Sequence, residues 1–205
     1  MIKVAIIDDH VVVRAGLKYV LASDPDMAFV GEFGGGAGAA QFVSEQKPDV
    51  TLLDVRMPDL NGVEALKEIL AANPKARVVM LTTSDVEEDV YRSIEEGAFG
   101  YVQKEAPVEE ILGAIHSAMN GEVYMSEEIR RIYETRKGAK GLSPREAEVL
   151  SAVAEGLNNR LVGERLGISE NSVKMHLKRI YYKLGADDRT EAVNLALKRG
   201  FLTRG

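Results

Sequence analysis

Residues 4–9 of the chain read Val-Ala-Ile-Ile-Asp-Asp, and residues 50–54 read Val-Thr-Leu-Leu-Asp. Both stretches are short, mostly apolar runs that end in aspartate, a pattern typical of strands buried in a parallel sheet. The carboxyl ends of parallel strands line the functional crevice of an open α/β sheet, so we expect Asp8, Asp9 and Asp54 to converge there. Each aspartate alone could instead cap a helix or end a strand at the surface. Three together would repel one another, which favours a divalent-cation site built from hard oxygen ligands.

The pattern of strand followed by helix repeats five times up to about residue 121. The predicted strands are residues 3–8, 28–33, 49–54, 77–82 and 98–103, with helical segments and breakers between them. This alternation predicts an α/β fold, a doubly wound five-stranded parallel sheet. The glycine-rich run 34–38 could indicate a dinucleotide-binding loop. It follows the second strand and no Lys-Ser or Lys-Thr pair comes after it, so we interpret it as a flexible loop.

Composition excludes several classes of site. The chain has 205 residues, enough for two domains, and it contains no cysteine, which rules out disulfides, thiolate zinc sites and cysteine nucleophiles. Its three histidines, His10, His116 and His176, make a histidine-built metal site improbable. No apolar run approaches the ~18 residues of a membrane helix, and the first residues lead straight into a strand without a secretion signal. We therefore expect a cytoplasmic protein without a membrane partner.

The two halves of the chain differ in charge and in pattern. Residues 1–140 carry 15 Lys and Arg against 24 Asp and Glu, whereas residues 141–205 carry 11 against 8. The acidic half suits a metal-dependent site, and the basic half suits a polyanion. Residues 122–141 end rich in glycine and lysine and are predicted to be an interdomain linker. A capping box at Ser143 then opens an all-helical pattern. In it, a short helix, a turn with Gly167 and a longer basic helix favour a helix-turn-helix.

With these motifs identified, the chain resembles bacterial two-component response regulators of the NarL/FixJ family over essentially its whole length. The receiver motifs that carry the resemblance are Ile7-Asp8-Asp9-His10, residues 53–59 with Asn61-Gly62-Val63-Glu64, Leu81-Thr82-Thr83 and residues 100–104, and those of the second domain are residues 142–146, 155–159 and 172–177. The resemblance implies a flavodoxin-like receiver domain at residues 1–121, the linker at 122–141, and a smaller all-α, LuxR-type DNA-binding domain at 142–205.

The resemblance also implies a chemistry for the first domain. Asp54 would take a phosphoryl group from a phosphohistidine of a sensor histidine kinase. Mg²⁺ would be held by a set of four ligands, Asp8, Asp9, Asp54 and the backbone carbonyl of Arg56. Lys104 would pair with the phosphoryl oxygens, and Thr82 would move toward them, leaving space for Tyr101 to fill from outside. The alternative for Tyr101 is an aromatic side chain at a strand edge.

A helical wheel of the segment after Ser169 supports the DNA-binding interpretation. Its apolar face is formed by Val173, Leu177, Ile180 and Leu184, and its opposite face is basic. An ordinary solvated helix would be the alternative. By resemblance, Lys174, Met175 and Lys178 enter the major groove, and Arg179 with Asn158 or Asn159 lies nearer the phosphates. The resemblance further implies that phosphorylation leads to a homodimer, which would bind inverted-repeat promoter sites of double-stranded DNA, with RNA polymerase as a further candidate partner.

Two other functions compete with a phosphorylation-controlled transcription factor. A Mg²⁺-dependent phosphatase of the haloacid-dehalogenase type would carry Asp-x-Asp-x-Thr at the first strand, whereas here Asp8 and Asp9 are adjacent and the nucleophile candidate lies on the third strand. We therefore expect a regulator, not an enzyme. The other possibility keeps the DNA-binding domain but makes the first domain an unphosphorylated dimerisation module. The complete set Asp8, Asp9, Asp54, Thr82 and Lys104 argues against it.

Overall fold

The computed structural model describes residues 1–83, 86–138 and 141–202 of the chain. The polypeptide divides into two compact units, one made of residues 1–85 and 89–132 and the other of residues 86–88 and 133–205. Within the part of the chain that the structure describes, no helix is both long and apolar enough to cross a lipid bilayer.

The first unit is built on a parallel sheet with the strand order β2-β1-β3-β4-β5-β6. The strands are β1 (Ile2–Ile7), β2 (Met27–Phe33), β3 (Val50–Asp54), β4 (Val78–Thr82), β5 (Gly100–Gln103) and β6 (Tyr124–Met125). The five strands predicted from the sequence are confirmed, and β6 is an addition to them. β6 has only two residues, which pair with Gly100 and Tyr101 of β5. No apolar run marks it, so β6 could not be predicted from the sequence.

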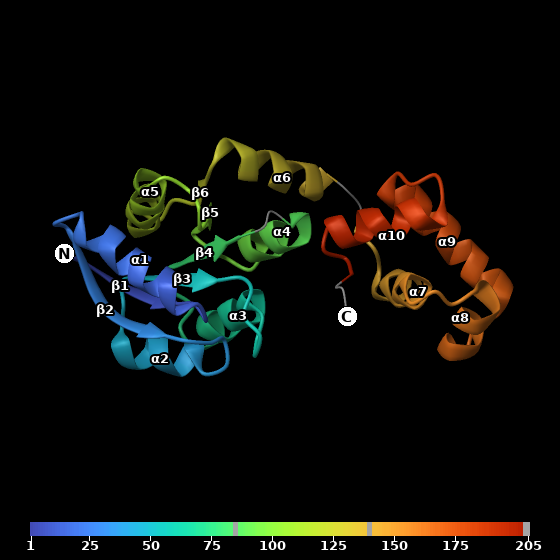
Figure 1. Ribbon diagram of the computed structural model, residues 1–205, viewed down its shortest axis with the longest axis horizontal. Coiled ribbons are helices and arrows are strands. Elements are labelled where there is room, and N and C mark those ends of the chain that lie inside the picture. Colours follow the sequence, from blue (N-terminus) through green and yellow to red (C-terminus); the bar gives the residue numbers. More distant parts are fainter. Residues whose placement is uncertain (84–85, 139–140, 203–205) are drawn as a thin grey trace. The chain divides into compact units, whose positions relative to one another are not determined.

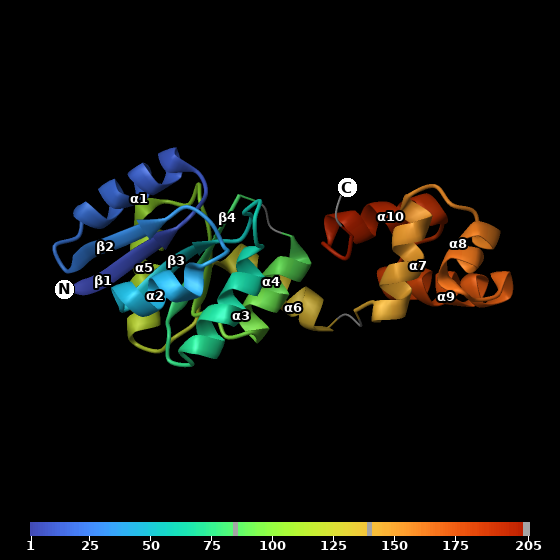
Figure 2. The same ribbon diagram turned by 90° about the horizontal axis from the view of Figure 1, so that it is seen from below.

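Helices cover both faces of the sheet, which makes the unit doubly wound. They are α1 (Val11–Ala22), α2 (Ala39–Gln46), α3 (Gly62–Ala72), α4 (Glu87–Glu95) and α5 (Val108–Met119). α1 and α5 pack on one face, and α2 and α3 pack on the other (Figure 1, Figure 2). Successive strand residues point to opposite faces, so Val4 and Ile6 pack with Leu17 of α1 and Ile115 of α5 in one core cluster. Strands with both faces buried explain the nearly unbroken apolar runs of the sequence.

The glycine-rich loop before α2 has a structural role that differs from the flexibility we expected. The backbone N–H groups of Gly36 and Ala37 donate to the Asp59 carboxylate at 3.0 and 2.9 Å. A side chain at Gly36 would place its Cβ 2.3 Å from the carbonyl oxygen of Leu60, so no other residue fits there. The glycines thus allow this loop to lie against the loop that follows β3.

The second unit contains helices α7 (Pro144–Ala154), α8 (Asn159–Leu166), α9 (Glu170–Leu184) and α10 (Arg189–Lys198). Ser143 and Glu146 form the predicted capping box at the start of α7. The predicted apolar face of α9 is confirmed, because Val173, Leu177, Ile180 and Leu184 are all buried in one core cluster. Within the predicted linker, residues 127–138 form helix α6 (Glu127–Gly138), in which Ile129 is buried.

Candidate functional site

An ion-paired cluster lies at the carboxyl ends of β1, β3 and β5. The Nζ atom of Lys104 lies 2.7 Å from Asp8 Oδ2 and 2.7 Å from Asp54 Oδ2. These side chains are 7%, 0% and 1% exposed, so one ammonium group serves two buried carboxylates. Two buried carboxylates beside one ammonium group leave an excess of negative charge in the pocket, which favours the entry of a further cation. The convergence of Asp8 and Asp54 that the apolar runs predicted is therefore observed.

The sheet register explains why these side chains meet. Ile7 pairs with Leu53, so the residues that follow them on β1 and β3 emerge side by side. The backbone N–H of Lys104 donates to the Thr82 carbonyl at 2.7 Å, which fixes the lysine beside the same edge. Gly62 at the start of α3 is needed for the approach of the helix, since a Cβ there would lie 2.0 Å from the Asp54 carbonyl oxygen.

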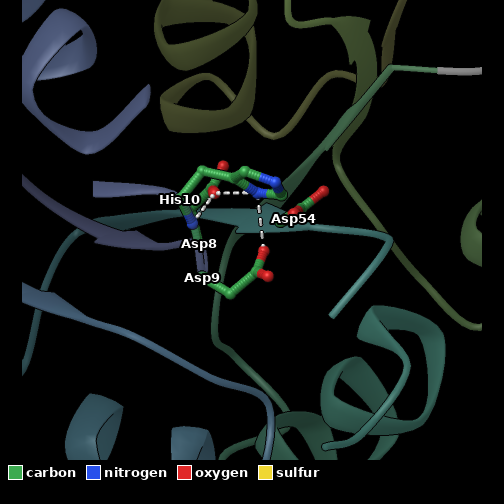
Figure 3. Close-up of side chains that lie close together, drawn as sticks. All are labelled: Asp8, Asp9, His10 and Asp54. Carbon is green, nitrogen blue, oxygen red and sulfur yellow. Dashed lines mark hydrogen bonds and ion pairs between the residues drawn. The ribbon is translucent and has the colours of Figure 1, made fainter. Parts of the chain in front are cut away.

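Asp9 and His10 complete the cluster (Figure 3). His10 Nδ1 lies 2.8 Å from Asp9 Oδ1 and 3.5 Å from Asp8 Oδ1. One ligand atom from each of Asp8, Asp9, His10 and Asp54 lies within 4.8 Å of the others, an arrangement that could hold a metal ion. Three of the four ligands are carboxylates, which suits a hard cation such as Mg²⁺. His10 is the N-cap residue of α1, and its contact with Asp9 was not predicted from the sequence.

Burial and charge set the pKa values of the central pair. Burial raises the pKa of Asp54, and the hydrogen bonds from Lys104 and the Arg56 backbone only partly offset it, while the charge of Asp8 raises it further. Burial alone would lower the pKa of Lys104, but its hydrogen bonds to Asp54 and Asp8 outweigh this effect and raise the pKa above its ordinary value. Lys104 therefore remains an ammonium group, and an incoming cation would favour ionised Asp54.

Thr82 and Tyr101 lie on the neighbouring strands β4 and β5. Both side chains are fully buried. β5 is covered by β6 and is not an edge strand, which removes the alternative of Tyr101 as an exposed aromatic side chain at a strand edge.

Arg56 links the cluster to helix α4. Its backbone N–H donates to Asp54 Oδ1 at 3.1 Å, and its guanidinium Nη2 lies 2.8 Å from Oδ2 of Asp89. Burial raises the pKa of Asp89, and the Arg56 charge partly offsets this. This pair could not be predicted from the sequence, because an acidic residue in the first turn of a helix is common and belongs to no motif.

A separate exposed surface lies on α9, opposite its buried face. It is formed by Lys174, Met175, Lys178, Arg179 and Tyr182, all of them exposed in the structure. Met175 and Tyr182 are large side chains that are 58% and 87% exposed on this same face. The same helix therefore presents a basic and partly aromatic face to the surroundings, as the helical wheel predicted.

The cations of this unit divide into two groups. Lys174 Nζ lies 2.8 Å from Glu170 Oε1 on the same helix, and Lys183 Nζ lies 2.6 Å from Glu146 Oε2. By contrast, the side chains of Lys178 and Arg179 make no ion pair or hydrogen bond with any described residue, so their charge is available to a partner.

Asn158, just before α8, and Asn159, its first residue, both make hydrogen bonds within the domain. Asn158 caps the helix by accepting from the Leu161 N–H at 3.0 Å. Asn159 Oδ1 accepts from Arg189 Nη1 at 3.4 Å, and Arg189 also donates to the Leu157 carbonyl. Gly163 allows the turn to approach, because a Cβ there would lie 2.6 Å from the Ile168 carbonyl oxygen. This close contact explains the glycine inside a helix of the helix-turn-helix.

Comparison with known proteins identifies the family. Residues 4–116 match the response regulator receiver domain family, and residues 140–196 match the luxR family of bacterial regulatory proteins. The chain belongs to the two-component response regulators. It is 40% identical over 212 residues to the transcriptional regulatory protein YxjL of Bacillus subtilis, covering 98% of this chain and 97% of that protein. It is 34% identical over 198 residues to the nitrate/nitrite response regulator NarL of Escherichia coli, covering 92% of both.

The fold of this response regulator is also found in solved structures. A structure of two RcsB dimers bound to two parallel DNAs matches with a TM-score of 0.74 at 24% identity, covering 96% of this chain and 98% of that one. The response regulator is thus a DNA-binding transcription regulator with a flavodoxin-like receiver and a helix-turn-helix domain, and the family is not one of enzymes.

Proposed function

We propose that Asp54 of this response regulator accepts a phosphoryl group from a sensor histidine kinase and that this event controls DNA binding by α9. The observation that carries the proposal is the Lys104 ammonium group, 2.7 Å from the carboxylates of both Asp8 and Asp54 in a buried pocket. An ammonium held there can neutralise oxygens that arrive on Asp54. An acidic pocket with a preformed cation beside its central carboxylate is suited to forming an aspartyl phosphate.

In this proposal, a carboxylate oxygen of Asp54 attacks phosphorus, and the bond from phosphorus to the histidine nitrogen of the kinase breaks. Asp8, Asp9 and Asp54, with the Arg56 carbonyl, would hold Mg²⁺, which when bound neutralises charge on the phosphoryl oxygens. Lys104 keeps its proton through the reaction because its pKa is raised, so it acts as a fixed positive charge. Thr82 and Tyr101, both buried on adjacent strands, are the proposed elements that rearrange afterwards.

The DNA contacts of the proposal fall on the exposed face of α9. Lys178 and Arg179 are its unpaired cations, and Met175 is the exposed apolar residue beside them. We assign base-edge contacts in the major groove to Lys174, Met175 and Lys178, and phosphate contacts to Arg179 and Asn159. RcsB, which has the same fold, was solved as dimers on DNA. A homodimer of this regulator on an inverted repeat is the corresponding proposal, and RNA polymerase is a further candidate partner.

Labelling with acetyl phosphate and Mg²⁺ tests the proposed site. We expect the full chain to gain one acid-labile phosphoryl group, Asp54→Ala to gain none, and Asp9→Ala to be labelled slowly because its metal site is weakened. Asp59→Ala is the matched control, since this exposed aspartate accepts hydrogen bonds from the glycine-rich loop and lies outside the acidic cluster. Undiminished labelling of Asp54→Ala would contradict the proposal. A wild-type chain that takes no label would favour the unphosphorylated dimerisation module.

A further inference from the structure

Arg56 has its backbone in the acidic pocket and its side chain on a different element. The backbone N–H is fixed 3.1 Å from Asp54 Oδ1, while the guanidinium group lies 2.8 Å from the Asp89 carboxylate in the first turn of α4. The base of the side chain is therefore next to the phosphorylation site, and its charged end is held away by an ion pair. An arginine side chain is long and flexible enough to turn its guanidinium group from Asp89 back toward Asp54.

The two partners of the ion pair are held unequally. The Arg56 side chain is 47% exposed, whereas that of Asp89 is only 13% exposed. A largely buried carboxylate depends on its counter-charge, but a half-exposed guanidinium can leave with water as its replacement. If a stronger anion competes with Asp89 for the guanidinium group, Arg56 moves to the anion and Asp89 loses this partner.

Phosphorylation of Asp54 would create such an anion. A phosphoryl group brings about −1.5 to −2 charges and three acceptor oxygens. Lys104 is already shared between Asp8 and Asp54, so it cannot neutralise that charge alone. A guanidinium group offers paired N–H donors that match two phosphoryl oxygens, which gives a stronger contact than its bond to one oxygen of Asp89.

We propose that Arg56 exchanges Asp89 for the phosphoryl group on Asp54, and that this exchange releases the first turn of α4. The inference rests on the proposed phosphorylation of Asp54 and adds a second cationic residue that acts on it. Val90 and Ser93 are the buried residues of α4, and Asp89, in its first turn, is held by the Arg56 ion pair. Loss of the Arg56 contact thus changes the stability of α4 and carries the signal out of the pocket.

The affinity of the Mg²⁺-loaded full chain for beryllofluoride, a stand-in for the phosphoryl group, tests the exchange by calorimetric titration. Arg56→Gln should bind roughly tenfold more weakly, because a charge-assisted contact to the anion is lost. Asp89→Asn should bind several-fold more tightly, because Arg56 no longer has to leave a partner. Arg56→Gln/Asp89→Asn should match Arg56→Gln alone, because Asp89 acts only through Arg56. A merely structural ion pair would weaken binding in both single variants.

Lys67→Gln is the matched control. The substitution removes the ion pairs of Lys67 Nζ with Glu96 Oε1, just after α4, at 3.3 Å and with Glu64 Oε2 of α3 at 3.5 Å, and it should leave the affinity unchanged. Hydrogen exchange of α4 gives a second measurement: beryllofluoride should speed it in the wild type and in Lys67→Gln, and Asp89→Asn should exchange fast without it. Asp89→Asn that binds no more tightly than wild type would overturn the exchange while leaving the proposed function intact. A wild type that does not bind beryllofluoride would overturn both.

Discussion

Replacing Lys104 with methionine should destabilise the receiver domain strongly when Mg²⁺ is absent. The substitution keeps the length of the side chain but removes the one ammonium group that lies 2.7 Å from both Asp8 and Asp54. Both carboxylates are at most 1% exposed and would face each other without a counter-charge. Removing one partner of a buried ion pair typically costs about 3–5 kcal/mol, a large part of the stability of a small domain.

Mg²⁺ should recover much of this loss, because it brings positive charge to the same oxygens. A ligand that binds only the folded state stabilises it by about 2.7 kcal/mol at a concentration 100 times its dissociation constant. Lys104→Met should also bind Mg²⁺ more tightly than wild type, since the metal no longer competes with the ammonium group. The difference in stability between the variant and wild type should therefore shrink when Mg²⁺ is added.

Hydrogen exchange of the β3 and β4 amides in the full chain measures the stability of the receiver separately from that of the DNA-binding domain. Without Mg²⁺, these amides should exchange about 10²- to 10⁴-fold faster in Lys104→Met than in wild type. Lys18→Met is the control: it removes an ion pair with Glu32 whose side chains are 39% and 34% exposed, worth under about 1 kcal/mol. Equal effects of the two substitutions, or a loss that Mg²⁺ does not reduce, would refute the assignment of Lys104.

Three further predictions concern the DNA-binding domain. Lys178→Ala should weaken DNA binding and reduce the slope of log affinity against log salt concentration by about one unit. Lys174→Ala should weaken binding less, because Glu170 already offsets the charge of Lys174. A fluorescence titration at several salt concentrations checks both. Gly163→Ala should lower the free energy of unfolding of the domain, measured in urea, by about 1–3 kcal/mol, because the added Cβ meets the carbonyl oxygen of Ile168. Alanine has the higher helix propensity, so without this contact the substitution would stabilise the domain. A more stable variant would therefore contradict the contact. Burial raises the pKa of Glu146, but the hydrogen bonds from Lys183 and the capping box outweigh it and hold the pKa below 4.5. Ionised Glu146 should therefore stabilise the domain by about 2 kcal/mol, measured as the loss of unfolding free energy in Glu146→Gln. This stabilisation should be present above pH 4.5 and disappear as the pH falls through the lowered pKa.

Local patterns predicted the parts of the fold that local forces determine. β3, β4 and most of β1 are buried on both faces, so their apolar runs were visible, and the apolar face of α9 followed from helical spacing. β6 escaped prediction because two residues become a strand only through pairing with β5. The glycine-rich loop was interpreted as flexible because its partner, Asp59, lies more than 20 residues away in the sequence.

In the candidate site too, some contacts could be predicted from the sequence and others could not. The aspartates at the strand ends could be predicted, because strand direction alone brings them to one edge. The Arg56–Asp89 ion pair and the contact of His10 with Asp9 could not be predicted, since both depend on side-chain directions that no spacing encodes. The charge pattern of α9 was visible, but the pairing of Lys183 with Glu146 joins two separate helices and required the structure.

The affinity of the full chain for DNA, with and without beryllofluoride, measures whether the state of Asp54 controls DNA binding. The DNA is a sequence that the activated wild-type chain selects from a random library, and Mg²⁺ is present throughout. We predict that beryllofluoride raises the affinity of wild type at least about tenfold, which corresponds to roughly 1.4 kcal/mol, and leaves Asp54→Ala unchanged. The same increase in Asp54→Ala, or no increase in a wild-type chain that has bound beryllofluoride, would contradict the claim.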